Sequence, residues 1–136
     1  MPQRPIDTVT AFYTALSEGR ADAIASTIDE NFADDAAMVW PPTLPHGGRV
    51  EGSRKLRAIF SAIANPDAKT GATNLRLVRA IGDADDVVAW ITFDWKHPGE
   101  DTGTPNSALE LWKFSDGVVR SIHAYYWDAA SIAQPG

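Results

Sequence analysis

The sequence contains no cysteine among its 136 residues. Disulfide frameworks, thiolate nucleophiles and zinc-thiolate sites are therefore excluded. Positive charge is also scarce, because 12 Lys and Arg residues stand against 18 Asp and Glu residues and the formal net charge is -6. Nucleic-acid binding depends on clustered positive charge, so we expect no nucleic-acid partner.

Long apolar runs are missing as well. The opening MPQRPIDTV has neither the apolar core nor the cleavage site of a signal peptide, and no stretch reaches the length of a membrane span. We therefore expect a cytoplasmic protein with no membrane partner. The sequence has no glycine-rich phosphate loop, nucleophile elbow or dinucleotide fingerprint, so we expect no cofactor. A chain of this length forms one domain, which we assign to residues 1–136.

Aromatic residues, in contrast, are numerous: five Trp, five Phe and three Tyr. A core of this size needs fewer of them. The excess indicates either an aromatic-lined cavity or a large subunit interface.

The first half of the chain predicts three helices. Apolar residues recur at helical spacing over 5–18 and again over 21–32, which is typical of a helical hairpin. Residues 36–40 form a short apolar run that two prolines stop, so we expect a short strand at a sheet edge. Residues 43–52 read as a loop, and 53–64 as a third helix with a serine N-cap.

The second half changes to the period of strands. Apolar and polar residues alternate partly over 73–81 and cleanly over 87–96, where Phe93 and Trp95 share one face. A polar loop over 97–106 precedes the last two apolar runs. Helices followed by about four antiparallel strands predict an α+β fold with the helices gathered on one face of a curved sheet.

The last two runs flank Ser115-Asp116-Gly117, and Asp-Gly between such runs is a strong hairpin signal. A two-residue loop would set Lys113 opposite Arg120, two like charges that destabilise the pair. A three-residue loop, with Gly117 as a left-handed bulge, would set Trp112 opposite Arg120 instead. We favour the bulged loop.

This register gives the hairpin one face that carries two acids, Glu110 and Asp128. The other members of that face are apolar or aromatic: Ala108, Trp112, Phe114, Ile122, Ala124 and Tyr126. The opposite face is apolar too, with Leu109, Leu111 and Tyr125. Antiparallel sheets usually leave one face in water, so we expect helices on one side and a second copy on the other, a homodimer through the outer sheet face.

The two acids differ in their expected protonation. Burial on an apolar face raises the pKa of Glu110, which could then donate a hydrogen bond to a developing oxyanion, whereas Asp128 at the strand end would stay ionised as a base. Structural alternatives remain open. Glu110 could pair with Arg76, Arg79 or Arg120, and Asp128 could cap a short final helix.

The three histidines do not show metal-ligand spacing, so we expect no metal site. His46, in the predicted loop, is a candidate third catalytic residue, and the alternative is an ordinary loop histidine.

Four segments together resemble a known family: VTAFYTALSEGRADAI, AAMVWPP, GGRVEGSRKLRAIF and ELWKFSDGVVRSIHAYYWD. They are similar to the nuclear transport factor 2-like superfamily, and most to its SnoaL-like polyketide cyclase and ketosteroid isomerase branch. The resemblance implies a cone-shaped half-barrel of antiparallel strands, three helices from the first half over its concave face, a deep apolar pocket and commonly a dimer. Members include isomerases, cyclases, dehydratases, epoxide hydrolases and proteins without catalysis.

Ketosteroid isomerases use a tyrosine on the first helix, an aspartate base after the first strand and an acid on the penultimate strand. By this resemblance Phe12 occupies the tyrosine position, with Tyr13 one residue off and facing elsewhere. Trp40 stands in place of the aspartate, and Glu110 matches the acid. Only one of the three groups is present, which argues against isomerisation of a steroid by that mechanism.

Two further positions resemble other members of the superfamily. Asp128 is similar in position to the acid/base aspartate near the end of the last strand of polyketide cyclases. His46 could supply the histidine that dehydratases pair with an aspartate.

The sequence thus favours a small cofactor-independent enzyme of the cyclase, isomerase or dehydratase type, which acts by general acid/base catalysis on an apolar, oxygenated small molecule. The expected catalytic residues are Glu110, Asp128 and His46. The expected pocket walls are Phe12, Trp40, Phe93, Trp95, Trp112 and Tyr126. The alternatives are a binding or accessory domain without turnover, and a dimeric interaction module whose own side chains fill the cavity.

Overall fold

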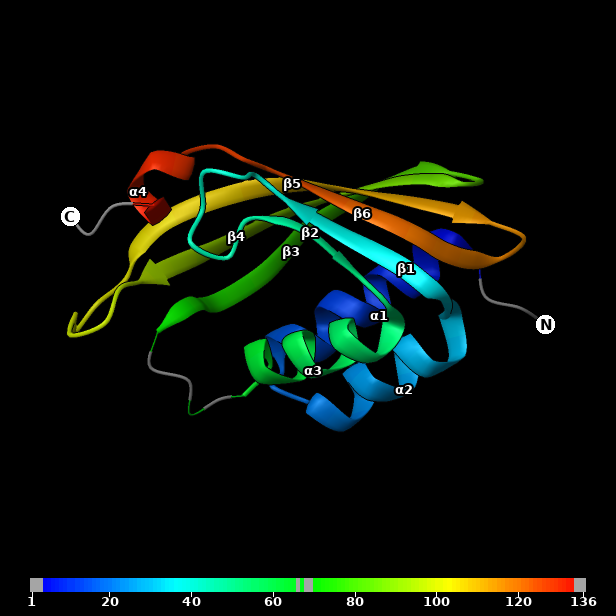
Figure 1. Cartoon of the computed structure of the whole chain (residues 1–136), viewed down its shortest axis with the longest axis horizontal. Coiled ribbons are helices and arrows are strands. Elements are labelled where there is room, and N and C mark those ends of the chain that lie inside the picture. Colours follow the sequence, from blue (N-terminus) through cyan, green and yellow to red (C-terminus); the bar gives the residue numbers. More distant parts are fainter. Residues whose placement is uncertain (1–3, 66, 68–69, 134–136) are drawn as a thin grey trace.

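The computed structural model describes residues 4–65, 67 and 70–133. Helices come first and long strands follow, which confirms an α+β fold (Figure 1). In chain order the elements are α1 (Pro5–Ser17), α2 (Ala21–Asn31), β1 (Phe32–Trp40), β2 (Gly48–Glu51), α3 (Ser53–Ile63), β3 (Gly71–Asp83), β4 (Asp86–Lys96), β5 (Thr104–Ser115), β6 (Val118–Tyr126) and α4 (Ala129–Ala133).

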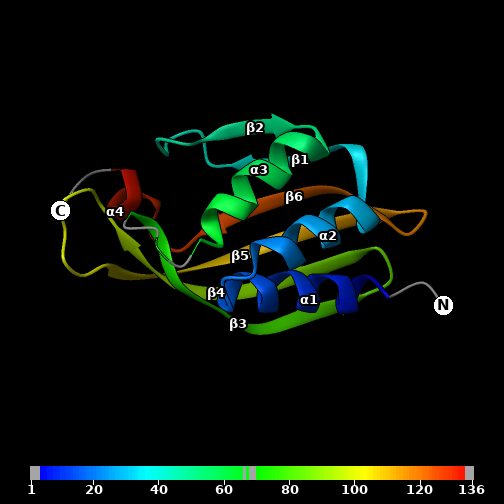
Figure 2. The same cartoon turned by 90° about the horizontal axis from the view of Figure 1, so that it is seen from below.

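The six strands form one curved, open sheet in the order β2-β1-β6-β5-β4-β3. Neighbours from β3 to β6 run antiparallel, whereas β1 runs parallel to β6, so the sheet is mixed rather than purely antiparallel. Helices α1, α2 and α3 lie side by side over one face of the sheet (Figure 2). None of the helices within the described ranges is long and apolar enough to cross a bilayer.

The region between α2 and α3 differs from the prediction. The expected short edge strand over 36–40 begins already at Phe32 and lies inside the sheet, because the predicted loop over 43–52 contains the true edge strand, β2. Ala36, Ala37 and Met38 are buried, as a strand with neighbours on both sides requires. Asp34 and Asp35 are exposed and charged. A prediction based on hydrophobicity therefore misses the first half of this strand.

The turn between β5 and β6 has two residues, Asp116 and Gly117, and Ser115 pairs with Val118. Both turn residues have positive φ, 53° and 79°, as a type I′ hairpin turn requires. The predicted three-residue loop is therefore wrong.

A bulge one step beyond the turn explains how the hairpin avoids the charge clash. The register shifts so that Lys113 lies opposite Ser121, and Arg120 becomes the additional residue. The Arg120 guanidinium instead lies 3.9 Å from the carboxylate of Asp35 on β1. The bulge thus separates Lys113 from Arg120, so the two-residue turn does not bring the like charges together.

The displaced bulge still turns the predicted residues inward. Glu110 lies opposite Ala124 and Trp112 opposite Ile122, and all four side chains are buried. The face of the hairpin that carries Glu110 is therefore the concave face of the sheet, covered by α1.

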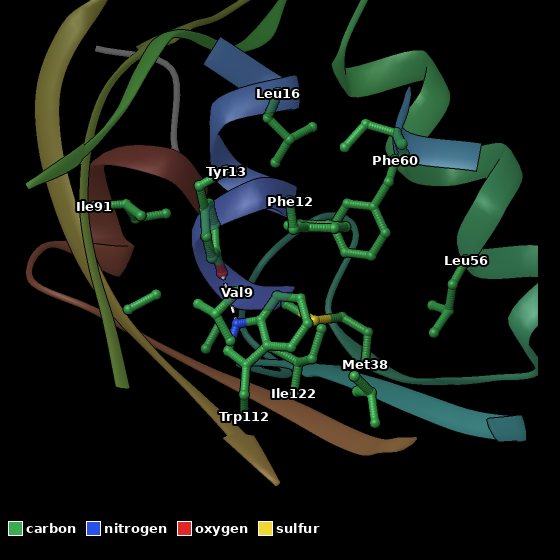
Figure 3. Close-up of a cluster of buried hydrophobic side chains, with 14 of the residues drawn as sticks. Val9, Phe12, Tyr13, Leu16, Met38, Leu56, Phe60, Ile91, Trp112 and Ile122 are labelled. Carbon is green, nitrogen blue, oxygen red and sulfur yellow. Dashed lines mark hydrogen bonds between the residues drawn. The ribbon is translucent and has the colours of Figure 1, made fainter. Parts of the chain in front are cut away.

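The core is built around rings from α1 and β5 (Figure 3). The Phe12 ring centroid lies 4.9 Å from that of Trp112, 5.0 Å from that of Phe60 and 5.2 Å from that of Tyr13, each pair edge to face. Such edge-to-face contacts fix the orientation of each ring. Phe12, Tyr13 and Trp112 are each at most 1% exposed.

Candidate active site

A cavity of about 550 Å³ lies between α3, the start of β3 and the ends of β1, β4 and β6. Apart from one histidine, one threonine and the polar atoms of the large rings, its lining is hydrocarbon. The lining residues are Trp40, His46, Val50, Ile59, Ala62, Ile63, Thr70, Gly71, Ala72, Trp95 and Tyr126. No Lys, Arg, Asp or Glu is among these described residues, so the cavity suits an apolar molecule with few polar groups.

His46 lies between two tryptophans of this lining. Its ring stacks on Trp95 at a centroid distance of 5.5 Å and meets Trp40 edge to face at 5.4 Å. Partial burial lowers the pKa of His46 below its usual value of 6.5. The imidazole is therefore neutral at pH 7 and can accept a proton.

Glu110 is a buried acid that reaches the helical layer. It is 6% exposed, and its Oε1 accepts a hydrogen bond from the hydroxyl of Tyr13 on α1. The Trp112 indole Nε1 donates in turn to that hydroxyl over 2.9 Å, the bond drawn in Figure 3. Three side chains thus form one buried polar chain within an aromatic core.

Burial raises the pKa of Glu110 from 4.5 to about 7, and the hydrogen bond from Tyr13 opposes this rise. Burial also raises the pKa of Tyr13 well above its usual range, with the charge of Glu110 as the second cause. The tyrosine therefore stays neutral, while Glu110 exchanges its proton near neutrality. This is the range in which a carboxyl group serves as a general acid or base.

Glu110 does not line the cavity itself, and its link to the lining is Tyr126. Tyr126 is two residues beyond Ala124, the partner of Glu110, and such diagonal neighbours share a face. The pKa of Tyr126 is raised by burial and then by the charge of Glu110, so the carboxyl acts electrostatically on the lining.

The second carboxyl oxygen of Glu110, Oε2, has no protein partner. In the described part of the chain every fully buried side-chain nitrogen and oxygen has a hydrogen-bond partner, and the one partner of Glu110 is the Tyr13 hydroxyl on Oε1. Oε2 must therefore retain some accessible surface. It is the oxygen of this group that is left without a hydrogen-bond partner among the described residues.

The predicted ion pair of Glu110 with Arg76, Arg79 or Arg120 is absent from the described residues. Its partner is Tyr13, which was expected to face elsewhere, and that expectation is wrong. The apolar stripe of α1 could have shown that Tyr13 is buried, since Val9, Phe12, Tyr13 and Leu16 share one helix face, but not which residue Tyr13 contacts.

The structure does not bring Asp128 to the cavity lining. Its side chain is exposed, and its Oδ1 accepts a hydrogen bond from the backbone N–H of Ser131 over 3.1 Å. This confirms the alternative that Asp128 caps the final helix, α4.

Of the predicted walls, Trp40, Trp95 and Tyr126 line the cavity together with His46. Phe12 and Trp112 lie in the core below it, and Phe93 packs behind Tyr126 at a centroid distance of 5.8 Å. Within the described ranges no three acidic or histidine side chains are grouped closely enough to hold a metal ion.

A family model described as SnoaL-like domain matches residues 9–122. An NTF2-like protein from Burkholderia thailandensis has a similar fold, with a TM-score of 0.76 at 15% identity over 98% of this chain and 99% of that chain. TerC, co-crystallised with polyporic acid, gives a TM-score of 0.69 at 19% identity over 89% of each chain.

A hypothetical protein with a ketosteroid isomerase-like fold from Catenulispora acidiphila, in complex with trimethylamine, gives a TM-score of 0.68 at 18% identity over 96% of this chain and 91% of that chain. A comparison with curated proteins finds no match. At these identities the solved structures establish the fold, and the chemistry must be argued from the site.

Proposed function

Because the chain belongs to the SnoaL-like domain family, we propose that it is a small cofactor-independent enzyme of the cyclase, isomerase or dehydratase type. Its substrate is an apolar, oxygenated small molecule held in the aromatic-lined cavity. The observation that carries the proposal is Glu110, a buried acid with a pKa of about 7 whose charge acts on Tyr126 in the lining of that cavity.

The shape and chemistry of the lining support this substrate class. Trp40, Trp95 and Tyr126 offer ring faces and edges, and aliphatic side chains of α3 fill the rest. Structures of this fold hold small molecules, since TerC was co-crystallised with polyporic acid. An apolar ligand with one or two oxygens would bury its rings here and direct an oxygen to the acid.

In the proposed mechanism protonated Glu110 donates a hydrogen bond or a proton to an oxygen on which negative charge develops. A second group removes a proton from the substrate. We assign this role to neutral His46, which lines the cavity, with Asp128, which follows β6 and does not line it, as the alternative base. Each well-placed group contributes about 10²- to 10⁴-fold.

We also propose that two copies associate through the outer face of the sheet. Trp90, Leu109 and Tyr125 form one row across β4, β5 and β6, with exposed fractions of 42%, 48% and 59%. On β3 the residue opposite Trp90 is Arg79, and the apolar residues Val78 and Ile81 on either side of it are 48% and 47% exposed. Exposed apolar rows of this kind are typical of subunit interfaces.

The test of the catalytic proposal compares Glu110→Gln with the wild-type protein on aromatic and polyketide-like ketones and enones. We expect turnover to fall at least 100-fold while ligand affinity stays within a few fold, because glutamine keeps the shape and loses the proton. A wild-type protein that binds such ligands tightly and never turns one over would support the rival, a binding or accessory domain.

A further inference from the structure

Only one direction of the hydrogen bonds among Trp112, Tyr13 and Glu110 satisfies every donor. An indole N–H donates and cannot accept, so Trp112 fixes the Tyr13 oxygen as an acceptor over 2.9 Å. Tyr13 has a single hydroxyl hydrogen, and its other neighbour within hydrogen-bond reach is Glu110 Oε1. The direction of the first bond therefore sets the direction of the second.

The reverse arrangement is costly. If Glu110 carried its proton on Oε1 and donated it to Tyr13, the hydroxyl hydrogen of Tyr13 would need another acceptor. Tyr13 is 1% exposed and has no further partner among the described residues. An unpaired buried donor loses its hydrogen bond to water without replacing it, so this arrangement is a minor one.

We propose that Tyr13 and Trp112 are positioning residues that confine the exchangeable proton of Glu110 to Oε2, the oxygen with no hydrogen-bond partner among the described residues. This inference rests on the proposed function, in which Glu110 is the general acid. Glu110 then loses and regains its proton at Oε2 while the bond from Tyr13 to Oε1 stays in place. The site needs no rearrangement between its acid and base forms, which is the condition for efficient proton transfer.

The surroundings of Glu110 favour this division of roles. Tyr13 faces it from α1 and Tyr126 from β6, and both have pKa values raised by burial, so both are neutral when Glu110 titrates. No Lys, Arg, His or second acid is among the groups that shift its pKa. Glu110 is thus the one group of this cluster that exchanges a proton near neutral pH.

Infrared difference spectroscopy of the full chain between pH 5 and pH 9 tests the proposal without a substrate. The carboxylic C=O band that disappears in Glu110→Gln belongs to Glu110. If the proton is on Oε2, the C=O oxygen is Oε1, which accepts from Tyr13 and therefore absorbs at a lowered frequency. We expect this band to move to higher frequency in Tyr13→Phe and, by a smaller amount, in Trp112→Phe, because the tyrosine hydroxyl then loses the donor that polarises it.

The titration of the same band is the second readout. The Tyr13 hydroxyl stabilises the ionised carboxylate, so Tyr13→Phe should raise the titration midpoint of Glu110 by about one pH unit, the equivalent of one hydrogen bond to a charged group. The matched control is Phe12→Leu, which changes the packing against Trp112 and removes no hydrogen bond. Its band and midpoint should match those of the wild-type protein.

A C=O band that stays in place in Tyr13→Phe would overturn the proposal, because it would put the proton on Oε1. A shift in Tyr13→Phe without any shift in Trp112→Phe would overturn the role of Trp112 alone. If the bands behave as expected but no substrate is turned over, the proposed function fails and the confinement of the proton stands.

Discussion

Tyr13 on α1 donates a hydrogen bond to Glu110 on β5, 97 positions later in the chain. This bond joins the first helix to the centre of the sheet inside an otherwise apolar layer. The burial that makes the contact possible is also the main cause of the raised pKa of Glu110. Packing of the fold and acidity of the candidate site therefore have the same physical origin.

Glu110 should make the protein less stable as the pH rises. Its pKa is about 7 in the folded chain against 4.5 as the reference value, so between these pH values the folded state binds more protons than the unfolded state. The stabilising contribution is complete below pH 4.5 and is lost as the pH rises through 7. The loss amounts to about 3 kcal/mol.

Urea unfolding at a series of pH values measures this loss, with Glu110→Gln as the reference because it cannot titrate. The difference in unfolding free energy between wild type and variant should fall by about 3 kcal/mol between pH 4 and pH 9. Parallel pH profiles for the two proteins would show that Glu110 titrates normally.

Two substitutions at Asp128 separate its structural role from a catalytic one. Asp128→Ala removes the cap of α4 and should cost about 0.5–2 kcal/mol of stability, whereas Asp128→Asn keeps an acceptor oxygen and should cost little. Denaturation gives these stabilities. If turnover survives in Asp128→Asn at the wild-type rate, Asp128 is not the base, and His46→Gln becomes the decisive variant.

Removal of a ring from the cavity wall should weaken the binding of apolar ligands. We expect Trp95→Leu to lower the affinity for a planar hydrophobic dye about three- to tenfold, because an aromatic contact contributes about 0.5–1.5 kcal/mol. Fluorescence titration measures the affinity of each variant for the dye. Trp127→Leu is the matched control, since Trp127 is 86% exposed and does not line the cavity. Equal losses in both variants would place the dye outside the cavity.

A charge in the outer apolar row should dissociate the proposed dimer. We expect Tyr125→Glu to sediment as a monomer at micromolar concentration, where the wild-type protein is a dimer, because two copies of the new carboxylate would be buried in the interface. Thr14→Glu, exposed on α1 at the helical side of the molecule, is the control and should remain dimeric. A monomeric wild-type protein contradicts the proposal directly.

The sequence predicted well those features that depend on local alternation. In β5, Glu110 and Trp112 alternate with exposed or half-buried neighbours, and this pattern alone points both side chains inward. The face of a strand residue depends only on whether its position is odd or even. The predicted inward face of β5 was therefore right although the predicted loop length was wrong. The location of the bulge could not be predicted, since it depends on Arg120 meeting Asp35 from a strand far away in the chain.

The candidate site was only partly predictable for a similar reason. The helical stripe permits both Phe12 and Tyr13 to be buried, but which of them meets an acid depends on where β5 lies relative to α1. Similarly, Trp40 and Trp95 lie beside His46 in the cavity because the loop that carries His46 folds back toward β1 as β2 pairs with it. No periodicity within one segment contains that information.

The parallel pairing of β1 with β6 also determines when the molecule can fold during synthesis. β1 is translated well before β6, its neighbour on one side, so its inner edge has no partner until residues 118–126 have been made. During that interval the backbone N–H and C=O groups on one edge of residues 36–38 have no strand partner, and an open edge with apolar side chains favours intermolecular association. A domain of the same size built from consecutive hairpins would leave no strand edge open over so long a stretch of synthesis.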